Sequence, residues 1–121
     1  MLNQVILVGR LTSDPELQVM ESGKKVTYVT VAVQRTYKNP DGIYEADFIR
    51  CVLWNGIATN TSDYCKRGDV VGVKGRIATR SYDDKEGTRK YVTEVVAEKV
   101  TFLSNSKKEI EDKTESQIRN W

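Results

Sequence analysis

The feature that most constrains the fold is a series of five segments rich in β-branched residues, each long enough to form a strand. Strand side chains alternate between two faces, and β-branched residues favour this conformation. Turn-forming residues separate the segments, and Asn39-Pro40-Asp41-Gly42 is the strongest such signal. The sequence therefore predicts an all-β fold with five strands, at residues 3–11, 25–37, 46–54, 69–82 and 90–103.

The connection at residues 55–68 differs from the turns and predicts a short helix. Lys66 and Arg67 suit the end of a helix, where cations interact favourably with the helix dipole. Gly68 suits the position just past that end. Four side chains would share one helical face: Ile57, Thr61, Tyr64 and Cys65.

This element order, five strands with one helix between the third and the fourth, is that of an OB-fold barrel. SH3-like and other small barrels come close to it. Gly9, Gly72 and Gly75 lie inside the strand segments, where glycine permits the sharp bends that a small barrel needs. We therefore expect a five-stranded OB-fold barrel with one short helix between strands three and four.

The composition divides the chain into two regions. Its 121 residues suffice for one domain, which we place at residues 1–103. Residues 104–121 contain four cations, four anions and few large apolar side chains, so we expect a polar tail that is either disordered or a frayed helix. The formal net charge of +2 is too small to indicate nucleic-acid binding by itself.

Several classes of function are disfavoured by what the sequence lacks. It contains no histidine and no nucleotide-binding glycine motif, and we interpret Asp83 and Asp84 as part of a solvated turn rather than a metal site. Cys51 and Cys65 are expected to be reduced structural thiols. We therefore expect no enzymatic activity, no cofactor and no metal. Without a signal peptide or a membrane-spanning apolar segment, the expected location is cytoplasmic.

The segment 46–54 has two different faces, and both are specialised. Ile49, Cys51 and Leu53 would point into the core. Burial against a partner subunit is one explanation of the opposite face. That face would carry two large aromatic residues and a cation: Phe48, Arg50, Val52 and Trp54.

The segment 69–82 repeats this pattern and favours another explanation. Val71, Val73 and Ile77 share one parity, and three cations with one aromatic residue share the other: Lys74, Arg76, Arg80 and Tyr82. Aromatic rings can stack on any nucleobase, and cations between them can neutralise phosphates. Since a duplex hides the faces of its bases, we interpret the aromatic and cationic face as a platform for single strands.

Five collinear segments within residues 1–103 are "NQVILVGRLTSDPEL", "VTVAVQRTY", "ADFIRCVLW", "YCKRGDVVGVKGRIATRSY" and "YVTEVVAEKVTFL". In these segments the sequence resembles the bacterial single-stranded DNA-binding protein family. The resemblance implies an OB-fold that assembles as a homotetramer and binds single-stranded DNA without sequence preference, in replication, recombination or repair. It also implies four base-stacking positions, three of which are often tryptophan in relatives: Tyr37, Phe48, Trp54 and Tyr82.

The expected partners are single-stranded DNA and further copies of the chain, in association with the nucleoid. Longer family members carry an acidic tip that recruits replication and repair enzymes. This sequence ends in "SQIRNW", which is not acidic, so we do not expect recruitment through a tip. Ten cations are expected to contact phosphates: Arg10, Arg35, Lys38, Arg50, Lys74, Arg76, Arg80, Lys85, Arg89 and Lys90.

Two other functions remain open at this point. The first is a protein-interaction OB-domain, such as an accessory subunit of a primosome or helicase that has lost strong DNA binding. The second is an RNA chaperone, because stacking on aromatic rings tolerates RNA as well as DNA.

Overall fold

Five long strands form where the sequence predicts them, with ends that differ from the predicted ones by at most two residues. In the computed structural model, which describes residues 1–104, a further two-residue strand, β2 (Gln18–Val19), was not predicted. The long strands are β1 (Val5–Leu11), β3 (Lys25–Lys38), β4 (Tyr44–Trp54), β5 (Val70–Asp83) and β6 (Arg89–Ser104).

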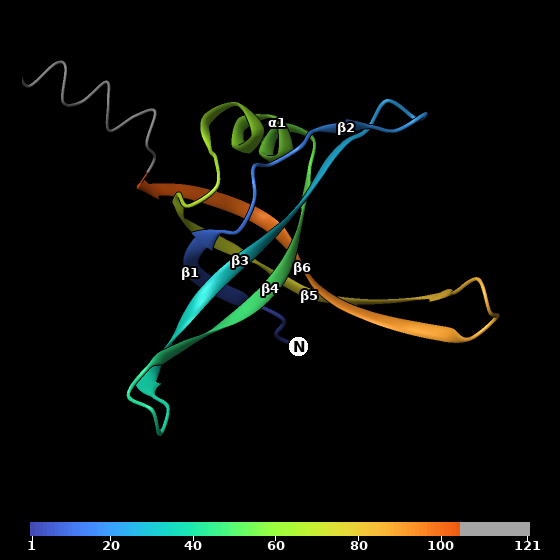
Figure 1. Cartoon of the computed structure of the whole chain (residues 1–121). Helices are drawn as coiled ribbons and strands as arrows, with labels where there is room; N and C mark the ends of the chain where they lie inside the picture. The colour runs from blue at the N-terminus through green and yellow to red at the C-terminus, as the bar shows by residue number, and fades with distance from the viewer. Residues whose placement is uncertain (105–121) are drawn as a thin grey trace, which may run out of the picture.

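The strands close into a barrel (Figure 1). Their order is β1-β5-β6-β4-β3-β2, and an additional antiparallel pairing between β1 and β3 closes the ring. β4 and β6 pair in parallel, whereas the other described pairings are antiparallel. The helix α1 (Asn55–Tyr64) connects β4 to β5, so the predicted OB-fold architecture is confirmed.

The helix ends earlier than the sequence suggested. It stops at Tyr64, and the Cys65 N–H donates to the Thr61 carbonyl at 3.0 Å. Lys66 and Arg67 therefore lie beyond the helix, and their predicted place in its last turn is wrong. Gly68, with φ +90°, lies in the following turn, where its N–H donates to the carbonyl of Leu11 at 2.9 Å.

The inward face of this segment matches the predicted one except at Tyr64. Thr61 and Cys65 are buried, as is Ala58, and Ile57 packs against the core. Tyr64 is instead 57% exposed, with its ring beside that of Phe102 at a centroid distance of 6.2 Å.

The barrel interior is filled mainly by the strand faces that alternation predicted. Cys51, Leu53 and Val71 are each no more than 1% exposed, and burial raises the pKa of the Cys51 thiol to about 11. Two residues of the segments 46–54 and 69–82 depart from the predicted faces. Val52 is buried although it faces outward, where its cross-strand neighbours are Tyr28 and Val96. Ile77 is 47% exposed because β5 is leaving the barrel there.

Two glycines allow backbones to approach closely where the barrel bends. A side-chain carbon on Gly9 would collide with the carbonyl oxygen of Ala32, at the pairing of β1 with β3. One on Gly75 would collide with the carbonyl oxygen of Val96, next to a bulge between β5 and β6. The predicted role of these two glycines is confirmed, whereas Gly72 has more open surroundings.

Two hairpins extend beyond the barrel, and we call them the β3–β4 arm (residues 34–46) and the β5–β6 arm (residues 79–93) (Figure 1). The predicted turns form their tips. Asn39 Oδ1 accepts from the backbone N–H groups of Asp41 and Ile43 at 3.0 and 2.9 Å. Asp84 Oδ1 accepts from the N–H of Thr88 at 2.8 Å in the same way, which agrees with its interpretation as a turn residue.

The predicted polar tail lies almost entirely outside the described residues, since β6 itself extends to Ser104. Within residues 1–104, no helix is long and apolar enough to cross a membrane.

Candidate nucleic-acid interface

The strand register places the aromatic and cationic side chains on one continuous outer surface. Cross-strand partners share a sheet face, and Arg76 pairs with Val96, Val96 with Val52, and Val52 with Tyr28. Alternation along the four strands extends this surface, which we call the aromatic face. Its central aromatic and charged members are Tyr28, Phe48, Arg50, Trp54, Arg76, Arg80, Tyr82, Lys90 and Glu94.

The rings of this face are accessible. Phe48 is 68% exposed and Tyr82 is 47% exposed, whereas Trp54 is half-buried where β4 meets the helix. Large exposed rings are costly to leave in water, so a row of them on one face indicates a binding surface. The predicted platform residues Phe48, Trp54 and Tyr82 are thus brought to one surface.

Two guanidinium groups lie over aromatic rings of the face. Arg50 Cζ is 4.8 Å from the centroid of the Tyr28 ring, and Arg80 Cζ is 6.0 Å from that of Tyr82. Contacts of this kind are cation–π interactions, in which the negative face of the ring attracts the cation. Both arginines were predicted to contact phosphates.

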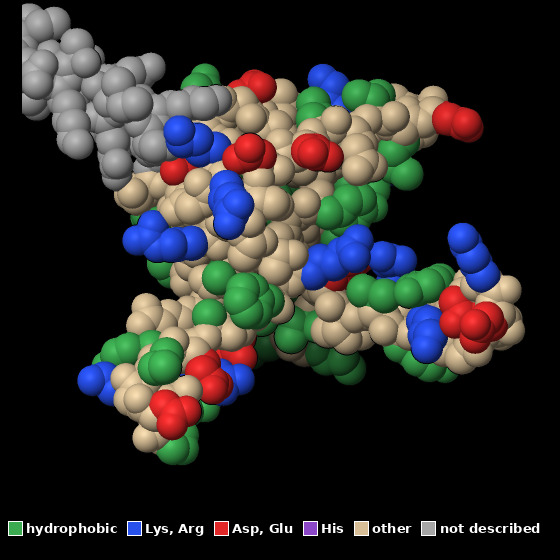
Figure 2. All heavy atoms as spheres, in the orientation of Figure 1, with side chains coloured by type: hydrophobic (Ala, Val, Ile, Leu, Met, Phe, Trp, Pro, Cys, Tyr) green, Lys and Arg blue, Asp and Glu red, His purple; other side chains and the backbone are tan. Residues whose placement is uncertain are grey.

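A buried carboxylate links the two arginines. Glu94 is 8% exposed; its Oε1 accepts from Arg80 Nε at 3.2 Å, and its Oε2 lies 3.5 Å from Arg50 Nε. Neither contact uses the terminal Nη groups, which therefore remain available for phosphate oxygens. Figure 2 shows cationic side chains gathered where the β5–β6 arm leaves the barrel.

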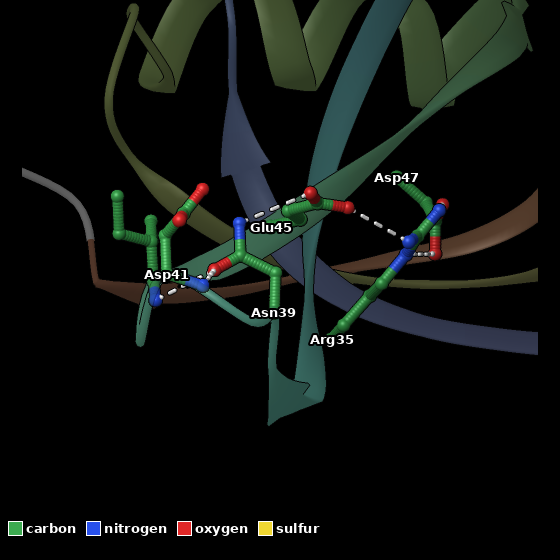
Figure 3. A network of polar contacts seen from close by, with 6 residues as sticks. Arg35, Asn39, Asp41, Glu45 and Asp47 are labelled. Atoms are coloured by element: carbon green, nitrogen blue, oxygen red, sulfur yellow. Dashed lines mark hydrogen bonds and ion pairs between the residues drawn. The ribbon is translucent and has the colours of Figure 1, made fainter.

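Arg35 is held differently from the other predicted phosphate contacts (Figure 3). It donates from Nη2 to Asp47 Oδ1 at 2.8 Å and from Nη1 to Glu45 Oε2 at 2.9 Å. The hydrogen bond raises the pKa of Arg35 and lowers that of Asp47. Asp47 pairs with Val33, on the side of β4 opposite to Phe48. Arg35 therefore fixes the β3–β4 arm, and its charge is offset by two carboxylates.

The remaining predicted residues surround the aromatic face rather than forming its centre. Arg10 shares a row with Ala32 and Phe48, but its Nη1 donates to the Gly68 carbonyl at 2.9 Å. Lys74 lies opposite Ile6, where β5 pairs with β1. The others lie on the two arms: Tyr37, Lys38, Lys85 and Arg89.

These arm residues have different surroundings. Tyr37 is 64% exposed, next to a register shift between Gln34 and Lys38 that interrupts the alternation. Lys38 Nζ lies 5.5 Å from the centroid of Tyr44. Arg89 donates to Ser81 Oγ at 3.1 Å and pairs with Asp83, on the face opposite to Tyr82. The register therefore does not assign Tyr37 or Arg89 to the aromatic face.

Sequence reasoning missed two members of this face. Tyr28 was a weak signal, because it is the only ring on the less apolar parity of the segment 25–37. Glu94 gave no signal, because an acidic residue in a strand is most simply interpreted as solvent-facing. Its burial depends on which strands lie beside β6, and this is known only from the fold.

Comparison with known proteins identifies the family. A sequence profile of the single-strand binding protein family matches residues 2–103. The chain belongs to this family. The resemblance noted in the sequence is thereby confirmed, and the matched residues include every member of the aromatic face.

Relatives within the family are similar over most of the chain. Single-stranded DNA-binding protein B of Bacillus subtilis is 51% identical over 109 residues, which cover 90% of this chain and 96% of that protein. Single-stranded DNA-binding protein 2 of Listeria monocytogenes is 47% identical over 99% of this chain and 75% of its own length. The single-stranded DNA-binding protein of Halalkalibacterium halodurans is 55% identical, over 85% of this chain and 61% of that protein.

Proposed function

We propose that this protein coats single-stranded DNA without sequence preference, as a binding protein and not as an enzyme. The observation that carries the proposal is the aromatic face, where Phe48, Trp54 and Tyr82 share one surface with Arg50 and Arg80. Family membership supports it, as do the names of the relatives, which are single-stranded DNA-binding proteins. The expected roles are in DNA replication, recombination and repair.

Binding combines two physical contributions. Bases stack on the exposed rings, which contributes about 1–3 kcal/mol per base and does not depend on base identity. Phosphates meet the free Nη groups of Arg50 and Arg80, with Arg76 and Lys90 beside them on the same face. Tyr37 and the cations of the arms would extend the contact surface beyond the barrel.

We further infer that the protein assembles as a homotetramer. The outer row of β1 is apolar, with Ile6 71% and Val8 53% exposed. Val8 pairs with Gly72, and the side chain of Leu103, itself 54% exposed, lies beside that glycine. An exposed apolar patch of this kind suits contact with a second copy of the chain. The assembly is expected in the cytoplasm, at the nucleoid.

A competition experiment tests the proposed function. Labelled single-stranded DNA is bound to the protein and displaced with unlabelled single-stranded DNA, single-stranded RNA or duplex DNA of matched length and sequence. We expect single-stranded DNA to compete best and duplex DNA to compete poorly, because duplex bases cannot reach the rings. Equal competition by RNA would favour an RNA chaperone. Absence of binding to any nucleic acid would favour a protein-interaction OB-domain.

A further inference from the structure

The rings of β4 leave a gap in the aromatic face. Phe48 and Trp54 are six residues apart, or about 20 Å along an extended strand. Between them the outward side chains of β4 are Arg50 and Val52, and neither offers an aromatic ring. Tyr28 of β3 pairs with Val52, so its ring lies beside the middle of this gap. A single-stranded DNA that passes from Trp54 to Phe48 therefore passes next to Tyr28.

The Tyr28 ring is held in place and remains partly open. It is 39% exposed, and the Arg50 guanidinium lies over it at 4.8 Å from Cζ to the ring centroid. Arg50 Nε in turn forms an ion pair with the buried Glu94, at 3.5 Å from its Oε2. A guanidinium that is tied at one end and stacked on a ring keeps the ring in one orientation.

A concavity of about 450 Å³ opens beside Tyr28, within the size range of small-molecule sites. It forms because residues 12–18 run alongside β3, where the Thr12 N–H donates to the Thr30 carbonyl at 3.1 Å and Gln18 pairs with Val26. The Arg67 N–H donates to Asp14 Oδ1 at 2.7 Å, and this hydrogen bond connects two walls of the concavity. Besides Tyr28, the lining residues are Thr12, Ser13, Asp14, Glu16, Gln18 and Arg67.

The charge of this lining selects the part of a nucleotide that fits. Two carboxylates, Asp14 and Glu16, outnumber the single cation Arg67, so a phosphate would be repelled. A neutral base can stack on the tyrosine ring and donate its ring or amino N–H groups to the carboxylate and side-chain oxygens. We propose that Tyr28 is a fifth base-stacking position and that this concavity holds one nucleobase of the bound strand. The inference rests on the proposed function and locates an additional subsite for it.

A single-tryptophan reporter tests the proposal directly. Tyr28→Trp is made in a chain that also carries Trp54→Phe and Trp121→Phe, and oligo(dT) is added while binding is followed separately by the polarisation of labelled DNA. We expect the emission from position 28 to be quenched as the DNA binds, because a stacked base contacts the ring. Saturating DNA that leaves this emission unchanged would overturn the proposal.

Replacing the ring gives an independent measurement. Tyr28→Leu keeps an apolar side chain but loses the aromatic face, so we expect affinity for oligo(dT) to fall about 5- to 150-fold, while Tyr28→Phe stays within about twofold of the parent. Tyr91→Leu is the matched control, since Tyr91 is 78% exposed but pairs with Ser81 on the opposite face of β6. A folded Tyr28→Leu variant that binds as well as the Tyr91→Leu control would contradict the proposal.

The two experiments also separate this proposal from the proposed function. If the parent chain does not bind single-stranded DNA, the proposed function itself fails. If the parent binds and only the position-28 effects are missing, the aromatic face is retained and the fifth position is refuted. Should Tyr28→Leu fail to fold, as judged by circular dichroism, the tryptophan reporter alone decides.

Discussion

At the scale of single residues, Trp54 gives the most direct report on base stacking. Trp121 lies outside the described residues, and we expect it to contribute little to the response. A Trp121→Phe variant should therefore keep most of the DNA-induced quenching, and Trp54→Phe should lose most of it while retaining substantial affinity. Trp54→Ala should weaken DNA binding by about 1–3 kcal/mol at the aromatic face of each subunit, as measured in a fluorescence titration. Dissociation of the assembly by Trp54→Ala, with Trp54 emission indifferent to DNA, would instead place Trp54 in a protein interface.

The arginines differ in whether their Nη groups already donate to carboxylates, and this gives a second prediction. Arg80 contacts Glu94 through Nε rather than through its Nη groups, whereas Arg35 donates through Nη1 and Nη2 to two carboxylates. For single strands, log affinity falls with log salt by about 0.7 per phosphate neutralised. Arg80→Ala should reduce that slope with little effect on base preference, and Arg35→Ala should change it much less. Equal effects in a salt titration would mean that Arg35 also reaches a phosphate.

The buried thiol of Cys51 predicts a dependence of stability on pH. Burial raises its pKa from 9.0 to about 11, so in the folded protein the thiol holds its proton where the unfolded chain releases it. Its contribution to stability is fully present below pH 9 and is lost as the pH rises through 11. In urea unfolding experiments across this pH range, the free energy of unfolding should decrease as the pH rises. For a Cys51→Ala variant it should decrease less steeply. Parallel curves for the two proteins would contradict the prediction.

The sequence predicts the burial of a side chain where that burial depends on alternation within one strand. It does not predict burial that depends on contacts between strands. The alternation within β4 alone separates Phe48 and Trp54 from Cys51 and Leu53, and the exposures agree. The burial of Val52 depends on partners from β3 and β6. The same is true of Glu94, whose two arginine partners come from β4 and β5. Such contacts require the register between segments distant in sequence, which a single sequence does not specify.

At the scale of elements, two glycines should respond in opposite directions to alanine. Gly75 lies against the carbonyl of Val96, so Gly75→Ala should force the strands apart and cost about 1–3 kcal/mol. Gly56, in α1, has open space where a side chain would lie, so Gly56→Ala should stabilise the helix by about 0.5–1 kcal/mol. Chemical denaturation of both variants measures these changes. Equal stability of the two would refute the close-approach explanation of barrel curvature.

Element boundaries show where local signals mislead. The segment 55–68 was correctly predicted to contain a helix, but its cations and glycine suggested an end near Gly68, whereas α1 ends at Tyr64. The Lys66 N–H donates to Asp69 Oδ2 at 2.9 Å, so a side chain from the next connection organises the chain after the helix. Capping residues mark a helix end only when no such competing contact is present.

At the scale of the whole molecule, the surface that we propose binds DNA and the surface that we propose for assembly occupy different parts of the barrel. The aromatic face lies on β3, β4, β5 and β6, whereas the apolar row lies on β1. The rings lie on β3, β4 and β5, whereas the apolar patch lies on β1 and at the end of β6, so a second copy could cover this patch without covering the rings. The element order predicted this barrel from the sequence, but the separation of the two surfaces depends on the closed strand order.

The oligomeric state is the last prediction. If the row containing Ile6 and Val8 is an interface, light scattering at micromolar concentration should give the mass of a tetramer, and Val8→Glu should lower that mass because a carboxylate cannot be buried there without a partner. Ile43→Glu is the matched control, since Ile43 is 61% exposed but lies in the turn of the β3–β4 arm, beyond the part of β3 that pairs with β1. Ile43→Glu should keep the parental mass. A monomeric parent that still binds single-stranded DNA would refute the tetramer, and it would leave the aromatic face of one subunit as the entire binding site.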